Sequence, residues 1–384
     1  MLENAFEGTF SFDQKSLTLQ TDDIDAIASL GFESCDLSLN KKVDVSAEGC
    51  SFIESIEECQ ADYDVISIED RFLYPGKRTD SMCDPSGRPT ERGFQMGAAQ
   101  PLEVVAEFQN GDFLENGDIA DDGTLYFTNY FEKALYAYKA NNEVEEVAQL
   151  PAHPVAVLVL PQGFLISAHN IPFTESPDEF TASNQLLQLT TDGSVQEVIT
   201  VPDARFLNGM TQLPDERYLI ADSIAATLWV FDPEDGSVSS WLQDELLAQD
   251  PSVEEFRPGA NGIKVVDNTL LISNSSRGTL MKLPLTGSMP DGVPSVFADT
   301  GPIDDFMVAI DGTIYATTHA EAVLSIDPNG NVSNVIESGC DGCTAVFSDP
   351  ASPSGDELLF LTTGNFLEGG QEPANIVRLY LERI

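Results

Sequence analysis

The chain has 384 residues and a formal net charge of −46, from 18 Lys and Arg against 64 Asp and Glu. This charge repels nucleic acids and anionic membrane surfaces, and no apolar run approaches the ~18 residues that a membrane helix needs. We therefore expect no nucleic-acid partner and no membrane association. The acidic residues are dispersed, which favours a folded protein from a saline or marine environment over a disordered acidic tail.

Residues 1–101 show no internal repeat and contain four of the six cysteines, namely Cys35, Cys50, Cys59 and Cys83. The chain has only three histidines, and no Cys and His pairing has the spacing of a zinc site. The motif "CDGC" (340–343) lacks the strand–helix context of a redox motif. We expect disulfides in a secreted or periplasmic protein, with free buried thiols as the alternative. We interpret residues 1–101 as a disulfide-tied extension packed on the rest of the chain; a separate small domain is the alternative.

Residues 102–384 repeat one pattern six times: a short apolar strand, a turn rich in Asp, Gly, Pro or Asn, and a second strand. Most copies are followed by a third strand, a turn such as "EDG" or "PNG", and a fourth strand. The second strands of the six copies end at Asn129, Asn170, Ser223, Ser275, His319 and Thr363. Repeats of four antiparallel strands at this period are typical of a propeller. The sequence predicts an all-β, six-bladed β-propeller.

Polar residues gather where the first strand of a repeat begins and where the second strand ends. The strand starts include Glu115, Asn208, Asn261, Asp304 and Asp305, and the strand ends include His169 and His319. In a propeller these positions meet at one mouth of the central channel. Converging carboxylates and amide carbonyls are ligands for a hard cation, and facing carboxylates repel unless a cation or a proton lies between them.

Several of these residues have a purely structural interpretation. Asn before Gly, in "LNG" and "ANG", often forms a turn, because Asn tolerates left-handed geometry. His169 and His319 could simply pack against neighbouring loops. Glu115 and the Asp304–Asp305 pair are harder to explain this way, because a buried carboxylate needs a partner.

The motifs in residues 102–384 resemble the senescence marker protein-30/gluconolactonase/luciferin-regenerating-enzyme family. They are "LENGDIADDG" with Glu115, "RFLNGM" with Arg205 and Asn208, "GANGIKV" with Asn261 and "IDDFMVAIDG" with Asp304. The resemblance implies a divalent metal held by Glu115, Asn261 and Asp304, with Asn208 facing metal and substrate. Ca²⁺ is the first candidate, and Zn²⁺, Mn²⁺ and Mg²⁺ are the others.

Two motifs depart from the family pattern. The family's "R-F-N-D" is "RFLNG" here, so the final Asp is missing, and "PDG" has become "DDF". The combination of motifs is similar to a fungal-type subgroup that includes propellers recruited to hetero-Diels–Alder cyclisation. Strictosidine-synthase-like propellers are a more distant similarity.

The leading hypothesis from the sequence is a monomeric, metal-dependent hydrolase of small-molecule esters, lactonase-like, with its site at one mouth of the channel. Asp304 or Asp305 would act as base on water, Asn208 would orient substrate, and His169 and His319 are second-choice proton carriers. No nucleophilic serine motif of the G-x-S-x-G type is present. A non-hydrolytic binder or cyclase is the alternative, and an interaction scaffold is the second.

Salt should stabilise this chain. Because a net charge of −46 repels itself, we expect the melting temperature to rise markedly between low salt and molar NaCl as the charges are screened. Thermal unfolding followed by circular dichroism at increasing NaCl measures this. A flat or falling melting temperature would contradict the saline-environment interpretation.

Overall fold

The computed structural model describes residues 102–381 except 140, 176–182, 254–256, 349–356 and 371. It also gives three short strands near the N-terminus: β1 (Ser11–Asp13), β2 (Ser16–Leu19) and β3 (Val43–Asp44), which form one sheet. The chain divides into two units, residues 1–99 and 100–384. The four N-terminal cysteines lie outside the described residues, so their pairing stays a prediction. No helix in the described part is long and apolar enough to cross a membrane.

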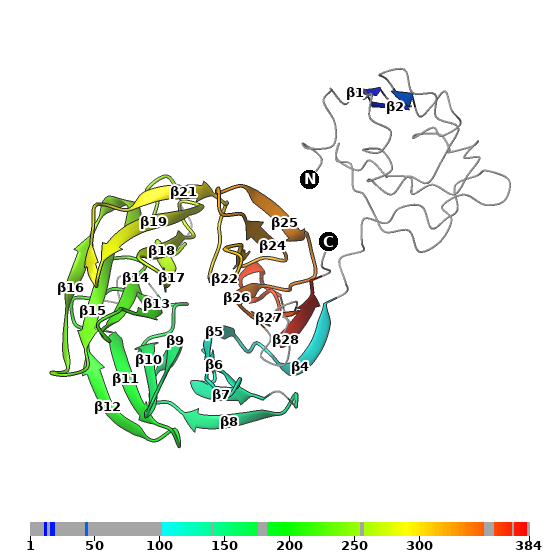
Figure 1. The fold of residues 1–384 in the computed structure, drawn as a ribbon. Helices are drawn as coiled ribbons and strands as arrows, with labels where there is room; N and C mark the ends of the chain where they lie inside the picture. Colours follow the sequence, from blue (N-terminus) through cyan, green and yellow to red (C-terminus); the bar gives the residue numbers. More distant parts are fainter. Residues whose placement is uncertain are drawn as a thin grey trace. The chain divides into compact units, whose positions relative to one another are not determined.

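The second unit is a six-bladed β-propeller, as the repeats predict (Figure 1). Blade 1 comprises β5 (Leu114–Ile119), β6 (Leu125–Asn129), β7 (Ala134–Tyr138) and β8 (Val144–Gln149). Blade 2 comprises β9 (His153–Leu160), β10 (Gly163–His169), β11 (Asn184–Thr190) and β12 (Val195–Thr200). Blade 3 comprises β13 (Leu207–Gln212), β14 (Tyr218–Asp222), β15 (Thr227–Asp232) and β16 (Ser237–Gln243). A short 3-10 helix, η3 (Glu245–Leu247), follows β16.

Blade 4 comprises β17 (Ala260–Val266), β18 (Thr269–Asn274), β19 (Thr279–Thr286) and β21 (Ser295–Asp299), and the short β20 (Met289–Pro290) also pairs with β19. Blade 5 comprises β22 (Phe306–Val308), β23 (Ile314–Thr317), β24 (Val323–Ile326) and β25 (Val332–Ile336). Blade 6 takes three strands from the C-terminal end, β26 (Cys343–Ser348), β27 (Glu357–Thr362) and β28 (Pro373–Tyr380), and a second 3-10 helix, η4 (Phe366–Glu368), lies between the last two.

The fourth strand of blade 6 is β4 (Glu103–Asn110), which pairs antiparallel with β28. The first strand of the propeller thus completes its last blade and closes the ring (Figure 1). The sequence repeat did not predict this pairing, because β4 precedes the first complete copy of the repeat. Closure places β5 beside β26, which brings Glu115 near the residues of blades 5 and 6.

The core is divided among the blade interfaces. Each pair of neighbouring blades buries one apolar cluster between them, and together the six clusters go once round the ring. In the cluster between blades 6 and 1, Phe127 and Leu359 are fully buried. A blade alone would expose both apolar faces, so the ring stabilises itself only as a whole.

Hydroxyl side chains link each blade to the innermost segment of the next. Thr128 Oγ1 donates to the Val155 carbonyl at 2.7 Å, and Ser223 Oγ donates to the Ala260 carbonyl at 2.7 Å. The same kind of bond links the other neighbouring blades: Ser167 to Asn208, Ser273 to Asp304, Thr317 to Thr344, and Thr344 to Leu114. These bonds satisfy carbonyl groups that face the next blade, and they fix the inner strands around the channel.

Three of the inner strands carry an Asn-Gly pair at a β-bulge. The residues outside the regular register are Glu115-Asn116, just before Gly117, then Asn208-Gly209, and Asn261-Gly262. None of these glycines has a positive φ, so the pairs are not left-handed turns. Glycine is needed for close approach instead: a Cβ on Gly209 would lie 2.5 Å from the Asn261 carbonyl oxygen, and one on Gly262 would collide with the Asp305 carboxylate. The bulges therefore let the blades meet closely at the point where the polar residues lie.

Candidate functional site

A cavity of about 590 Å³ opens among the inner strands and their connecting loops. Its polar lining comes from Glu115, Asn208, Arg257, Asn261 and His319, together with small hydroxyl residues. Most of the remaining wall is apolar: Phe113, Tyr130, Val155, Phe173, Phe206, Pro258, Pro302, Leu324 and Leu367. This combination of an apolar wall with a few convergent polar groups is typical of a small-molecule site.

Three carboxylates converge at the polar end of this cavity. Burial raises the pKa of Glu115 well above its ordinary value, and the nearby charges of Asp304 and Asp305 raise it further. Burial also raises the pKa of Asp304, although His319 and Asn261 act in the opposite direction. Like charges this close cannot all remain ionised without compensation.

The two aspartates have partners within the protein. Asp305 Oδ2 lies 2.9 Å from Lys264 Nζ and accepts a hydrogen bond of 2.9 Å from Asn116 Nδ2. Asp304 Oδ1 accepts a hydrogen bond of 2.6 Å from Asn261 Nδ2, and its Oδ2 lies 2.9 Å from His319 Nδ1. Glu115 has no such partner among the described residues, so its charge is the one left for a proton or an external cation to compensate.

Two asparagines present their amide oxygens for an outside partner. Asn208 Nδ2 donates to Ser223 Oγ at 3.2 Å, and Asn261 Nδ2 donates to Ser275 Oγ at 3.0 Å. Both serine hydroxyls in turn donate to backbone carbonyls of the next blade, which fixes each serine as an acceptor for the amide nitrogen. No described residue donates to the Oδ1 atom of either asparagine, so each remains a free acceptor in a residue that lines the cavity.

His319 adopts a left-handed backbone conformation, with φ of 60°, just after β23. Its Nδ1 contact with Asp304 has ion-pair length but not hydrogen-bond geometry, and its Nε2 has no hydrogen-bond partner among the described residues. Both ring nitrogens are buried, in a side chain that lines the cavity. Catalytic hydrogen bonds of this kind often tighten only when substrate binds.

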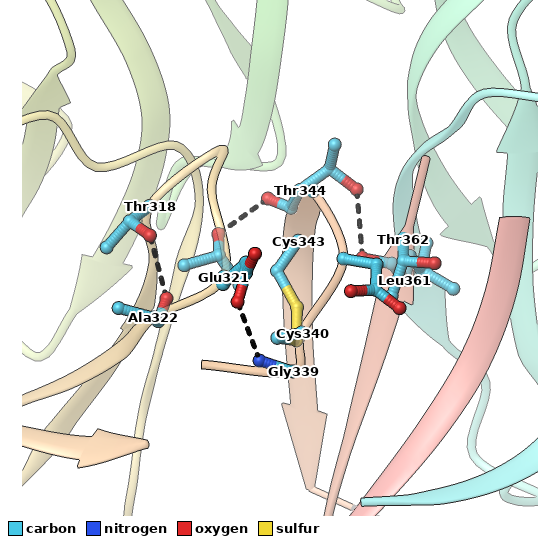
Figure 2. Close-up of a disulfide and its surroundings, with 12 residues drawn as sticks. Thr318, Glu321, Ala322, Gly339, Cys340, Cys343, Thr344, Leu361 and Thr362 are labelled. Atoms are coloured by element: carbon cyan, nitrogen blue, oxygen red, sulfur yellow. Dashed lines mark hydrogen bonds between the residues drawn. A yellow bond between two sulfur atoms is a disulfide. The ribbon is translucent and has the colours of Figure 1, made fainter. Parts of the chain in front are cut away.

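The loop that carries His319 is hydrogen-bonded to a segment that is closed by a disulfide between Cys340 and Cys343 (Figure 2). Both cysteines are fully buried. The His319 amide donates to the Cys343 carbonyl, and the Gly342 and Cys343 amides both donate to the Ala320 carbonyl, each at 3.1 Å. Gly339 adds a bond of 3.3 Å to the Glu321 carboxylate. These bonds offset the strain of the left-handed residue, which costs of order 1–3 kcal/mol. This pair agrees with the expectation of disulfides.

The other two histidines belong to an aromatic cluster around Tyr130. His169 Nδ1 lies 3.2 Å from the Tyr130 hydroxyl, and its Nε2 lies 2.8 Å from the Leu207 carbonyl. Burial lowers the pKa of His169 to about 4, so the ring stays neutral near pH 7. His153 stacks on Tyr130 and contacts its carbonyl oxygen at 3.0 Å.

Most of the residues singled out from the sequence are brought together. Glu115, Asn208, Asn261 and His319 line the cavity, and Asp304 and Asp305 are buried beside them. Two expectations need correction. β22 begins at Phe306, two residues after Asp304. His169 is buried and hydrogen-bonded outside the cavity lining, which removes it from the candidate proton carriers.

The residues present fit a hard cation in their chemistry. Glu115, Asn208 and Asn261 offer oxygen ligands, and the buried Asp304 Oδ2 and Asp305 Oδ1 atoms lack hydrogen-bond partners. The described part of the chain nevertheless contains no group of three or more carboxylate, His or Cys side chains placed to hold a metal. A bound cation would therefore depend on amide oxygens as well as carboxylates, as the expected set Glu115, Asn261 and Asp304 already implies.

Some contributors could not be read from the sequence. Lys264 lies three residues after Asn261 in "GANGIKV", and only the structure shows that it compensates Asp305. Ser223 and Ser275 each follow a second strand by one residue, a repeated position that could have drawn notice. Phe113 and Tyr130 resemble ordinary core residues in sequence.

The disulfide should hold His319 in place without being needed for the fold. In a Cys340→Ala/Cys343→Ala double variant, we expect a stability loss of about 2 kcal/mol for so short a loop. Imidazole NMR should show shifted or broadened signals for His319, with His153 and His169 as internal controls that do not change. Unchanged His319 signals would contradict this role.

Glu115 should cost stability wherever it is ionised without a cation. The pKa of Glu115 in the folded protein lies above its ordinary value of 4.5. The stability that the protonated carboxyl contributes is therefore fully present below about pH 4.5, and it is lost as the pH rises through the folded pKa. Glu115→Gln in chelator should therefore melt higher than the wild type at about pH 8 and show a smaller difference at about pH 5. An equal effect at both pH values would contradict the raised pKa. Glu132→Gln is the control, at another half-buried glutamate, whose carboxylate accepts a hydrogen bond from the Tyr136 hydroxyl.

No family model matches the sequence, and no curated protein matches it. Solved structures do match over the propeller. A luciferin-regenerating enzyme has a TM-score of 0.53 with 12% identity over 73% of this chain and 94% of its own. A calcium-binding regucalcin from Agrobacterium tumefaciens has a TM-score of 0.52 with 17% identity, over 74% of this chain and 97% of its own. A gluconolactonase from Xanthomonas campestris has a TM-score of 0.53 with 14% identity, over 74% of this chain and 93% of its own.

At these identities the likeness shows the fold alone, and the similarity to the fungal-type subgroup stays a prediction. The chain therefore has the six-bladed propeller fold that the senescence marker protein-30, gluconolactonase and luciferin-regenerating proteins share.

Proposed function

We propose that this protein is a hydrolase of small-molecule esters, lactonase-like, with its site at the polar end of the cavity. The observation that carries the proposal is the contact of 2.9 Å between His319 Nδ1 and Asp304 Oδ2, with His319 Nε2 unpartnered in a residue that lines the cavity. An imidazole oriented by a buried carboxylate is a general base of the kind that activates water.

In this mechanism His319 takes a proton from a water molecule while the water attacks the carbonyl carbon of the ester. Asp304 orients the ring and stabilises its protonated form, and Asn261 holds Asp304 in place through the 2.6 Å hydrogen bond. Lys264 keeps Asp305 compensated, so that Asp305 does not compete for the proton. The protonated His319 then returns its proton to the leaving oxygen. The apolar wall limits the access of bulk water.

A divalent cation, with Ca²⁺ as the first candidate, would be held by Glu115, Asn261 and Asp304, with Asn208 beside them. When bound, it would supply polarisation of the substrate carbonyl. In its absence the raised pKa of Glu115 favours the protonated carboxyl, which can donate a hydrogen bond to the same carbonyl oxygen. Both forms leave the role of His319 unchanged.

A non-hydrolytic binder or cyclase that uses the same cavity is the second candidate. The observation that favours it is the predominance of aromatic and aliphatic side chains in the wall, which suits a protein that folds a reactive apolar substrate into one conformation. It predicts binding without hydrolysis of any ester or lactone.

The hydrolase proposal is tested by activity on a panel of aryl esters and aromatic lactones. We expect His319→Gln to lower kcat by about 10²–10⁴-fold, the usual contribution of a general base, with a small change in KM. Asp304→Asn should also lower kcat, because it removes the charge that stabilises protonated His319.

His153→Gln is the matched control, since His153 does not line the cavity. Wild-type kcat in His319→Gln would contradict the proposed base. If the wild type hydrolyses nothing in the panel but is stabilised by panel members, the binder or cyclase takes the place of the hydrolase.

A further inference from the structure

Arg257 stands apart from the other arginines of the described part. Each of the others has an interaction partner, whereas no described residue forms an ion pair or a side-chain hydrogen bond with the Arg257 guanidinium. The arginines with partners are Arg205, Arg217, Arg277 and Arg378. In a chain with 64 acidic residues, a lone guanidinium is unexpected, because an acidic partner is easily found.

Arg257 is also part of the cavity lining and is half-buried. Its backbone is anchored: the Arg257 carbonyl accepts a hydrogen bond of 2.6 Å from Gln249 Nε2, and the Pro258 carbonyl accepts one of 2.8 Å from the Ser276 amide. The next residue, Gly259, donates to the Ser223 carbonyl at 2.8 Å. The guanidinium therefore projects from a segment fixed to blades 3 and 4.

We propose that Arg257 is the anchor for a carboxylate on the ligand, and that the natural ligand is an apolar molecule with a carboxylate group. This inference rests on the cavity's being the substrate site of the proposed function, and it adds the substrate class. The guanidinium matches a carboxylate by two parallel hydrogen bonds, which an ammonium group does not offer.

The charges of the cavity fix the orientation of such a ligand. Without a bound cation, a ligand carboxylate is repelled from the Glu115 end, where three carboxylates converge. Among the described residues of the lining, Arg257 is the only Lys or Arg, so the carboxylate lies beside it. The apolar body then contacts Phe113, Phe173 and Phe206, and an uncharged ester or other carbonyl group reaches Glu115 and His319.

Two matched probes without an ester group test the proposal without requiring any activity. They are the carboxylic acid 2-naphthylacetic acid, which is ionised at neutral pH, and its neutral isostere 2-naphthylacetamide. Calorimetric titration should show the acid binding about fivefold or more tightly than the amide to the wild type, the worth of a partly exposed ion pair. This preference runs against the repulsion of the acid by a net charge of −46. Arg257→Gln should abolish the preference and leave the affinity for the amide unchanged.

Arg217→Gln is the matched control, because it makes the same change in charge at an exposed pair with Asp215 and should keep the preference. The proposal is overturned if the wild type binds the amide as tightly as the acid, if the preference survives in Arg257→Gln, or if neither probe binds at millimolar concentration. Because the probes lack an ester, failure of the hydrolase proposal would leave this result intact, and the converse also holds.

Discussion

The site depends on one electrostatic constraint: Glu115, Asp304 and Asp305 are brought together where six inner strands meet. Folding cannot avoid this, because the ring closes only when β5 lies beside β26 and β4 pairs with β28. Each aspartate is compensated by groups of the protein itself, Asp304 by His319 and Asn261, and Asp305 by Lys264 and Asn116. The compensation leaves Glu115 as the carboxylate whose charge a proton or a cation can satisfy.

The same constraint connects the fold to the proposed chemistry. The Asn-Gly bulges let neighbouring blades approach, and that approach places Asn261 against Asp304 and Asn116 against Asp305. The Ser223 and Ser275 hydroxyls donate hydrogen bonds to the next blade, so they accept from the amide nitrogens of Asn208 and Asn261 and leave the amide oxygens free. His319 gains its position from a separate device, the loop closed by Cys340 and Cys343. Structural and functional roles thus share the same few residues, while the apolar strands behind them supply the stability.

Much of this arrangement could be predicted from the sequence because it repeats. Each blade is built from local hairpins, so turn residues and strand periodicity predicted six blades, and the polar positions predicted one mouth with Glu115, Asn208, Asn261 and Asp304. Contacts between blades are different, since no local pattern records them. The closing strand β4, the Lys264–Asp305 pair and the lone Arg257 guanidinium all depend on residues far apart in the chain. His169 lies one residue before the repeat position that corresponds to His319, and its ring is buried against Tyr130 and the Leu207 carbonyl.

Direct titration of the Glu115 carboxyl tests the central claim most closely. Carboxyl ¹³C NMR of the chelator-treated protein, with the Glu115→Gln spectrum to assign the signal, gives the midpoint for this one group. We expect a midpoint well above 4.5, because burial and two neighbouring carboxylates favour the neutral acid. A midpoint at or below 4.5 would contradict this expectation, because it would mean that the three carboxylates do not share one site.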